Sequence, residues 1–184
     1  MPFASRLTRL STICGWLALC ADVSMASDGN HPSKLDRLMH AVAEHHRLRA
    51  SLGFALNEHR VCVASNSEEL IRRMREHFGE AISSAQAYDL MFVAIEGKEP
   101  ELGLPFRTQR VEPRPDSRSD LHRHSHSDEV ADIDGGRVVR EADTGLQFLL
   151  GSDMTLAVGA CLEHRQQIIQ HLRRRCAGPL EQPR

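Results

Sequence analysis

The hydrophobic positions of this chain change their spacing several times, and each change predicts a different element. Residues 33–50 carry leucine, methionine and valine at helical spacing, and Ser33 is typical of a helix start. Residues 52–56 and 61–63 alternate between apolar and polar instead, on either side of a turn at 57–59. That alternation predicts a β-hairpin with one buried face.

The clearest local signal is the start of a second helix. Asn66 is followed three residues later by Glu69, the spacing of a capping box, and apolar residues then recur at helical spacing up to Phe78. The nearly continuous apolar run at 88–96 predicts a buried strand. We expect this strand and the strand at 61–64 to lie in one sheet, connected by the helix.

Residues 97–134 differ in composition from the segments before them, with four prolines and many charged residues. The pattern allows a short strand at 106–111, and we expect the rest to form a long exposed loop. Residues 113–129 in particular cannot bury enough apolar area to offset the cost of ordering, so they should lack regular structure. Alternating histidines of this loop can bind nickel, copper or zinc adventitiously, and whether they hold a metal stays open. These histidines are His122, His124 and His126.

The last third of the chain predicts strands at 137–141, 146–150 and 154–158, separated by glycine-containing turns. Such a series is typical of an antiparallel meander, and a helix over 162–176 follows it. We therefore expect an α+β fold, with a mainly antiparallel sheet, two or three helices packed on it and a long irregular loop in the middle. A single domain over 33–176 would contain all of these elements.

The two ends, 1–32 and 177–184, are expected to lie outside this domain. Arg6 and Arg9 precede a short apolar run and then small residues, which is the layout of a secretory signal, although the run is too short to span a bilayer. Two interpretations stay open. Either the segment is signal-like and the protein is exported, or it is an extension upstream of the true start and the protein is cytoplasmic.

Composition narrows the candidate functions. The net charge of −2 creates no global field that favours nucleic acid or an acidic membrane. Five cysteines without a short CxxC spacing argue against a structural zinc site or a full disulfide framework. His40 and Glu44 are one helical turn apart, but there is no HExxH motif, so a metal site is not expected there.

The chain also lacks the motif that a nucleotide-binding loop needs. A P-loop has the pattern G-x-x-x-x-G-K-[ST] after a strand, because backbone N–H groups must wrap the phosphates and the lysine must reach them. The two lysines, Lys34 and Lys98, do not lie in glycine loops, and neither GxGxxG nor GxSxG occurs. No catalytic, cofactor-binding or metal-binding residue is assigned from the residues alone.

Four stretches, taken in order, resemble HprK-related kinases of the B type, which are relatives of the HPr kinase/phosphorylases. The resemblance spans residues 35–176 and depends on the order and spacing of weak motifs. The four stretches are RVCVASNSEEL at 60–70, DGGRVVR at 134–140, TGLQFLLG at 144–151, and AVGACL at 157–162 with the helix QQII at 166–169.

The resemblance implies the N-terminal part of an HprK-related serine kinase. In that family a P-loop kinase domain, which uses ATP and Mg²⁺, follows this region, whereas this sequence stops at Arg184. We therefore expect the chain alone neither to bind ATP–Mg²⁺ nor to transfer phosphate, and no catalytic residue of the family is carried over. ATP and Mg²⁺ would belong only to the missing kinase part.

The resemblance also implies partners. A separate P-loop kinase half or a protein substrate would bind this chain, and family members tend to be encoded beside an ATP-grasp-like enzyme and a CofD-like protein. Two alternatives remain. The chain is a free-standing protein-interaction module derived from that region, or a small exported binding protein. No nucleic-acid partner and no membrane span are expected.

Overall fold

The computed structural model describes residues 31–82, 88–110 and 127–177. Three α-helices lie in these residues: α2 (Lys34–Glu44), α3 (Glu68–Phe78), which a short 3-10 turn η1 (Gly79–Ala81) follows, and α4 (Arg165–Cys176). The strands are β1 (Ala50–Leu56), β2 (His59–Ser65), β3 (Leu90–Glu96), β4 (Arg107–Arg110), β5 (Ser127–Ile133), β6 (Gly136–Arg140), β7 (Gln147–Leu150) and β8 (Met154–Gly159).

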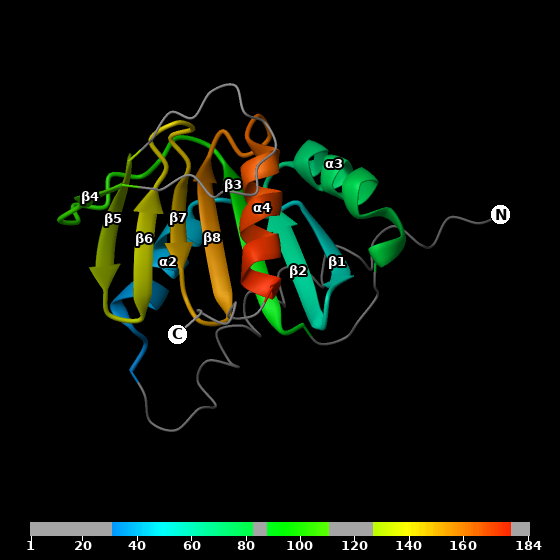
Figure 1. Cartoon of the computed structure of the whole chain (residues 1–184), viewed down its shortest axis with the longest axis horizontal. Helices are drawn as coiled ribbons and strands as arrows, with labels where there is room; N and C mark the ends of the chain where they lie inside the picture. Colours follow the sequence, from blue (N-terminus) through cyan, green and yellow to red (C-terminus); the bar gives the residue numbers. More distant parts are fainter. Residues whose placement is uncertain (1–30, 83–87, 111–126, 178–184) are drawn as a thin grey trace.

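The described strands form one mixed sheet in the order β1-β2-β3-β8-β7-β6-β5-β4. β2, β3 and β8 run parallel to one another, and every other neighbouring pair is antiparallel. In Figure 1, α2 lies behind the sheet, and α3 and α4 lie in front of it. The predicted α+β architecture, a mainly antiparallel sheet carrying helices, is confirmed. Among the described residues, no helix is long and apolar enough to cross a membrane.

Strand β3 is buried on both faces, which explains its continuous apolar run. Phe92 and Ala94 pack in the cluster that α3 and α4 cover, and Val93 and Ile95 pack in the cluster that α2 covers. All four side chains are almost completely inaccessible to solvent. Because successive side chains of a strand point to opposite faces, only a strand covered on both sides needs an apolar residue at every position. The prediction that β2 and β3 are buried strands of one sheet, joined by a helix, is confirmed.

Three helix boundaries differ from those that the sequence predicted, and one of them is the start of α4, which begins at Arg165 rather than at residue 162. α2 ends at Glu44 rather than near residue 50, because the chain must extend to pair with β2, and the Arg49 N–H already donates to the Ser65 carbonyl at 2.8 Å. α3 has Ser67 as its N-cap, whose hydroxyl accepts from the Leu70 N–H at 3.2 Å. Asn66, the predicted cap, binds another strand instead.

The interval 97–134 is not irregular throughout, and the prediction of a loop is wrong for residues 127–133. β4 confirms the short strand near 106–111, but β5 was not predicted. A tight turn at Asp134-Gly135 folds β5 onto β6, with Ile133 opposite Gly136, and Val130 and Ala131 are buried. Residues 113–126, which include the three alternating histidines, lie outside the described residues, as do residues 1–30 and 178–184.

The turn of the first hairpin fixes the end of α4. Asn57 has φ 55°, a left-handed conformation that asparagine tolerates better than most residues. Its side-chain Nδ2 donates to the carbonyl of Cys176 at 3.0 Å, which satisfies one of the carbonyls that a helix end leaves unbonded. One residue therefore shapes the β1–β2 turn and anchors the last turn of α4.

Two substitutions at this turn separate these roles. Asn57→Gly keeps the left-handed conformation accessible but removes the bond to α4, and we expect a loss of about 1 kcal/mol in unfolding free energy. Asn57→Ala also forces a side chain with a Cβ into that conformation, and we expect about 1 kcal/mol more. Urea denaturation of both variants measures the difference. Equal losses would contradict the role of the turn conformation, and wild-type stability of Asn57→Gly would contradict the role of the bond.

Candidate functional site

The carboxyl edge of the parallel strands β2, β3 and β8 is the first place to look for a site. In open sheets, ligands bind outside the carboxyl ends of parallel strands, because helix starts and loop N–H groups gather there. Here the edge is formed by Ser65 at the end of β2 and Asn66 after it, by Glu96 at the end of β3, and by the turn 160–164 between β8 and α4.

Asn66 joins the ends of β2 and β3. Its Nδ2 donates to the Glu96 carbonyl at 2.9 Å, and its Oδ1 accepts from the Glu96 N–H at 2.8 Å. Beside it, the buried Ser65 hydroxyl donates to the Ala94 carbonyl at 2.6 Å and accepts from the Ser67 N–H at 3.0 Å. These side chains therefore add hydrogen bonds between two parallel strands. The bonded atoms are not available to a ligand.

The Glu96 side chain reaches the third strand of this edge. Its Oε2 accepts from the Leu162 N–H at 2.7 Å, in the turn that leads from β8 to α4. The adjacent Gly97 N–H donates to the Gly159 carbonyl at 3.1 Å. A backbone N–H between a strand and a helix is a typical anion-binding group. In this protein a carboxylate of the chain itself already occupies that position.

The cysteine of the same turn is held as a thiol. Cys161 is fully buried, and its Sγ donates to the Ile95 carbonyl at 3.3 Å. Burial, followed by the nearby charge of Glu96, raises its pKa to about 12. Since the thiolate is the nucleophilic form, this residue has no role as a nucleophile in the neutral range.

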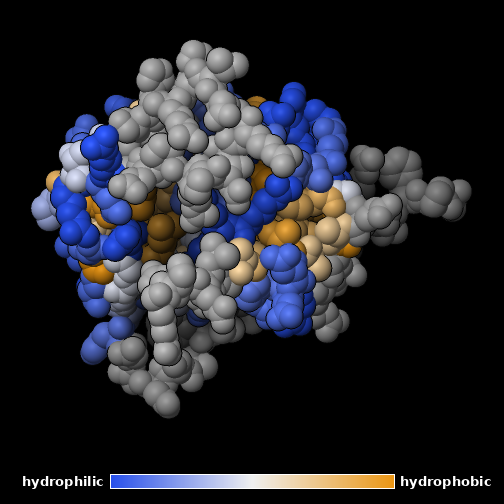
Figure 2. Space-filling view, in the orientation of Figure 1, coloured by the Kyte–Doolittle hydropathy of each residue, from blue (hydrophilic) through white to orange (hydrophobic). Residues whose placement is uncertain are grey.

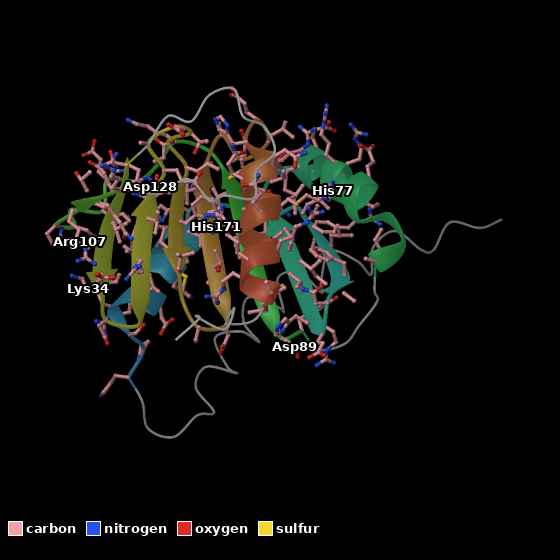
Figure 3. The ribbon with its side chains drawn as sticks, viewed as in Figure 1. Lys34, His77, Asp89, Arg107, Asp128 and His171 are labelled. Atoms are coloured by element: carbon pink, nitrogen blue, oxygen red, sulfur yellow. The ribbon has the colours of Figure 1, made fainter. Side chains whose placement is uncertain are left out.

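A second polar cluster lies between the end of β6 and α4. His171 Nε2 and Glu141 Oε1 are 3.3 Å apart, and the Thr144 hydroxyl donates to the other Glu141 oxygen at 3.0 Å. The His171 ring, labelled in Figure 3, stacks on Phe148 with centroids 3.9 Å apart. Burial raises the pKa of Glu141, but the bonds from His171 and Thr144 outweigh it and leave this pKa below its ordinary value.

This cluster resembles the carboxylate–imidazole pairs of acid–base catalysts only in composition. A catalytic hydroxyl would contact the imidazole that removes its proton, whereas the Thr144 hydroxyl is bound to the carboxylate. The side chains of His171 and Glu141 are only 14% and 17% exposed. The geometry supports a structural role, in which the pair ties α4 to the turn after β6.

The two lysines do not converge on a site. Lys34, labelled in Figure 3, begins α2, and its backbone N–H donates to the Asp134 carboxylate. Lys98 lies near the opposite end of the same helix, where it lines a shallow open hollow together with His45 and His46. The apolar part of this hollow comes from Ala41, Val42 and Pro100.

The metal-ligating side chains are also dispersed. His40 and Glu44 form an exposed pair at 3.4 Å, and the described residues contain no group of three or more side chains that could hold a metal ion. Within the described residues Cys62, Cys161 and Cys176 are buried and form no disulfide.

Several arginines are neutralised by carboxylates. On α3, Arg72 and Arg73 both donate to Glu69, and these bonds lower its pKa to about 2. At the start of the parallel strands, Arg60 binds Asp89 in a two-point pair, with one bond at 2.8 Å and the other at 3.2 Å. The Arg60 bonds lower the pKa of Asp89 to about 2. Asp89, labelled in Figure 3, was not singled out by sequence, because its partner is 29 residues away.

No family model, curated protein or solved structure matches this chain. The likeness to HprK-related kinases therefore stays a prediction from the sequence.

Removing the Glu96 carboxylate should loosen the carboxyl edge. Glu96→Ala leaves the Leu162 N–H without its charged acceptor, and we expect the unfolding free energy to fall by about 2 kcal/mol. Glu76→Ala is the matched control, since within the described part of the chain Glu76 pairs only with Arg72, on the exposed surface of α3. Urea denaturation of the two variants makes the comparison. A Glu96→Ala variant no less stable than the Glu76→Ala variant would contradict the account of this edge.

The Glu141 cluster predicts a pH dependence with a definite sign. Because the folded-state pKa of Glu141 lies below its ordinary value of 4.5, the ionised Glu141 carboxylate stabilises the fold above that value. The stabilisation is lost as the pH falls through the folded-state pKa. Glu141→Gln should therefore be less stable than the wild type at about pH 6, and the difference should shrink toward about pH 3. Denaturation curves across this range test it, and a difference that does not change with pH would count against the assignment.

Proposed function

We propose that this chain is the N-terminal, non-catalytic part of an HprK-related serine kinase and acts by docking on a separate polypeptide that carries the P-loop. The observation that supports this most is the bond between Glu96 and the Leu162 N–H. Strand β8, its following turn and α4 have the order of elements that surrounds a P-loop. The chain's own carboxylate, and no phosphate-binding lysine, stands at this turn.

The electrostatics of the edge favour the same proposal. A kinase works largely by positioning the transferred phosphoryl group and neutralising its charge, with N–H donors, a lysine and metal ions. A carboxylate at the N–H of the turn repels a triphosphate, and the lysines lie at opposite ends of α2. Under this proposal ATP and Mg²⁺ bind the partner polypeptide, in the cytoplasm, and this chain supplies a folded surface.

The ATP-grasp-like and CofD-like proteins that accompany B-type members belong to the same proposal as further candidate partners. The alternative, a free-standing protein-interaction module, shares the docking role but needs no P-loop partner. The two differ in one measurable way, which is whether phosphotransfer appears when a P-loop polypeptide is added.

The test combines calorimetry with ATP–Mg²⁺ and transfer of radiolabelled phosphate to a phosphocarrier protein. For the chain alone we expect no ATP binding in the micromolar range and no serine phosphorylation, because no N–H cradle is available. Adding a P-loop polypeptide of the HprK-related type should produce transfer above that of the P-loop polypeptide alone.

Micromolar ATP binding, or stoichiometric serine phosphorylation by this chain alone, would overturn the proposal. Absence of any stimulation by the P-loop polypeptide would favour the free-standing module instead.

A further inference from the structure

A continuous set of contacts connects the ends of α3 and α4 on the front of the sheet. Arg173 of α4 donates to His77 Nε2 of α3 at 3.2 Å. The His77 ring meets the Phe78 ring edge-on, with centroids 5.0 Å apart, and Phe78 stacks on Phe54 of β1 at 4.0 Å. Phe54 is in turn bridged through its backbone to Ile82.

The β1–β2 turn closes the other side of this set. Asn57 is bonded to the carbonyl of Cys176, one helical turn beyond Arg173. Leu56 precedes it and shares a face of β1 with Phe54, two residues earlier. We call the surface of Leu56, His77, Phe78, Ile82 and Arg173 the α3–α4 face. Figure 2 shows hydrophobic side chains gathered over β1 and β2, beside the hydrophilic surface of α3.

The apolar part of this face is incompletely covered. Ile82 is 40% exposed and is the one exposed large hydrophobic side chain among the described residues. Leu56 is only partly buried against the core. Removing such apolar surface from water is favourable in proportion to the area buried, so a partner that covers Ile82 and Leu56 gains affinity.

The charged part of the face is cationic and lacks a described counter-ion at Arg173. α4 carries four arginines and no acidic residue. Arg175 donates to the carbonyls of Gly151 and Ser152, but the bond that Arg173 makes ends on an imidazole. Because arginine only donates, His77 accepts through Nε2, and an imidazole brings no negative charge that would neutralise Arg173.

The neighbouring helix gives a direct contrast. Arg72 and Arg73 of α3 are both neutralised by Glu69, whereas Arg173 is exposed and has no carboxylate bound to it among the described residues. An apolar surface beside an unneutralised guanidinium group complements a segment that combines apolar and acidic side chains. The apolar component distinguishes such a segment from a nucleic-acid backbone.

We propose that the α3–α4 face binds an amphipathic acidic segment of a partner protein. Apolar side chains of the segment cover Ile82 and Leu56, and one of its carboxylates pairs with Arg173. The inference rests on the proposed function only for the identity of the partner, which is then the polypeptide that carries the P-loop.

The probe is a fluorescent synthetic helical peptide with leucine and glutamate on one face, measured by anisotropy against the whole chain. Two control peptides carry lysine in place of glutamate, or serine in place of leucine. We expect the leucine–glutamate peptide to bind more tightly than either control. Ile82→Asp and Arg173→Glu should each weaken its binding by about tenfold or more. Arg37→Glu, the same charge reversal on exposed α2 behind the sheet, should leave binding unchanged.

Backbone amide shifts of the ¹⁵N-labelled wild type locate the peptide without any substitution. Changes centred on His77, Ile82 and Arg173 support the inference. Equal binding of the lysine peptide, or shifts centred elsewhere, overturns it. Self-association of the wild type that Ile82→Asp abolishes would identify a second copy as the occupant and would also overturn it.

The inference and the proposed function fail separately. If the peptide binds at this face but no P-loop polypeptide stimulates phosphotransfer, the docking surface stands and the kinase role falls. If phosphotransfer is stimulated equally by the wild type and by Ile82→Asp, the kinase role stands and the docking surface falls.

Discussion

The bonds that join the carboxyl ends of β2, β3 and β8 hold the rest of the structure in place. Parallel strands have no hairpin turn to set their register, so side chains at their ends must help to do so. The Asn66 side chain hydrogen-bonds both the N–H and the carbonyl of Glu96, and the Glu96 carboxylate accepts a bond from the Leu162 N–H. At the opposite end, Arg60 and Asp89 join the starts of β2 and β3. Both helices on the front of the sheet depend on this register, because α3 follows β2 and α4 follows β8.

The same bonds determine what the molecule offers to other molecules. A carboxyl edge that binds nucleotides keeps its N–H groups free for phosphate, whereas Glu96 uses the Leu162 N–H to stabilise the fold. The thiol of Cys161 is likewise buried against the Ile95 carbonyl. Groups that could still bind a partner lie instead on the outer surface. Arg173, whose side chain contacts an imidazole, and the exposed Ile82 border the ends of α3 and α4. We therefore infer that the carboxyl edge stabilises the fold, and we propose the α3–α4 face as the surface that binds a partner.

Local patterns in the sequence predicted most of the elements, and they failed where a partner distant in sequence decided the outcome. The alternating residues of β1 and β2 and the apolar run of β3 were sufficient to place these strands. β5 was missed because Ser127, Asp128 and Glu129 resemble a loop, and only pairing with β6 makes them a strand. Asn66 has the local features of a helix cap, but its partner is 30 residues away, as is the partner of Glu141. No spacing rule identifies such pairs in a single sequence.

Hydrogen exchange of single backbone amides, measured by NMR, tests most directly whether the carboxyl edge is closed. Exchange reports how often each N–H loses its protecting bond, either by local opening or by global unfolding. We predict that the Leu162 and Glu96 amides exchange as slowly as the amide of Phe92 in the buried strand β3, with or without ATP–Mg²⁺. A Leu162 amide that exchanges far faster than Phe92, and that becomes protected only when ATP–Mg²⁺ is added, would show an open edge that receives a nucleotide and would contradict the account.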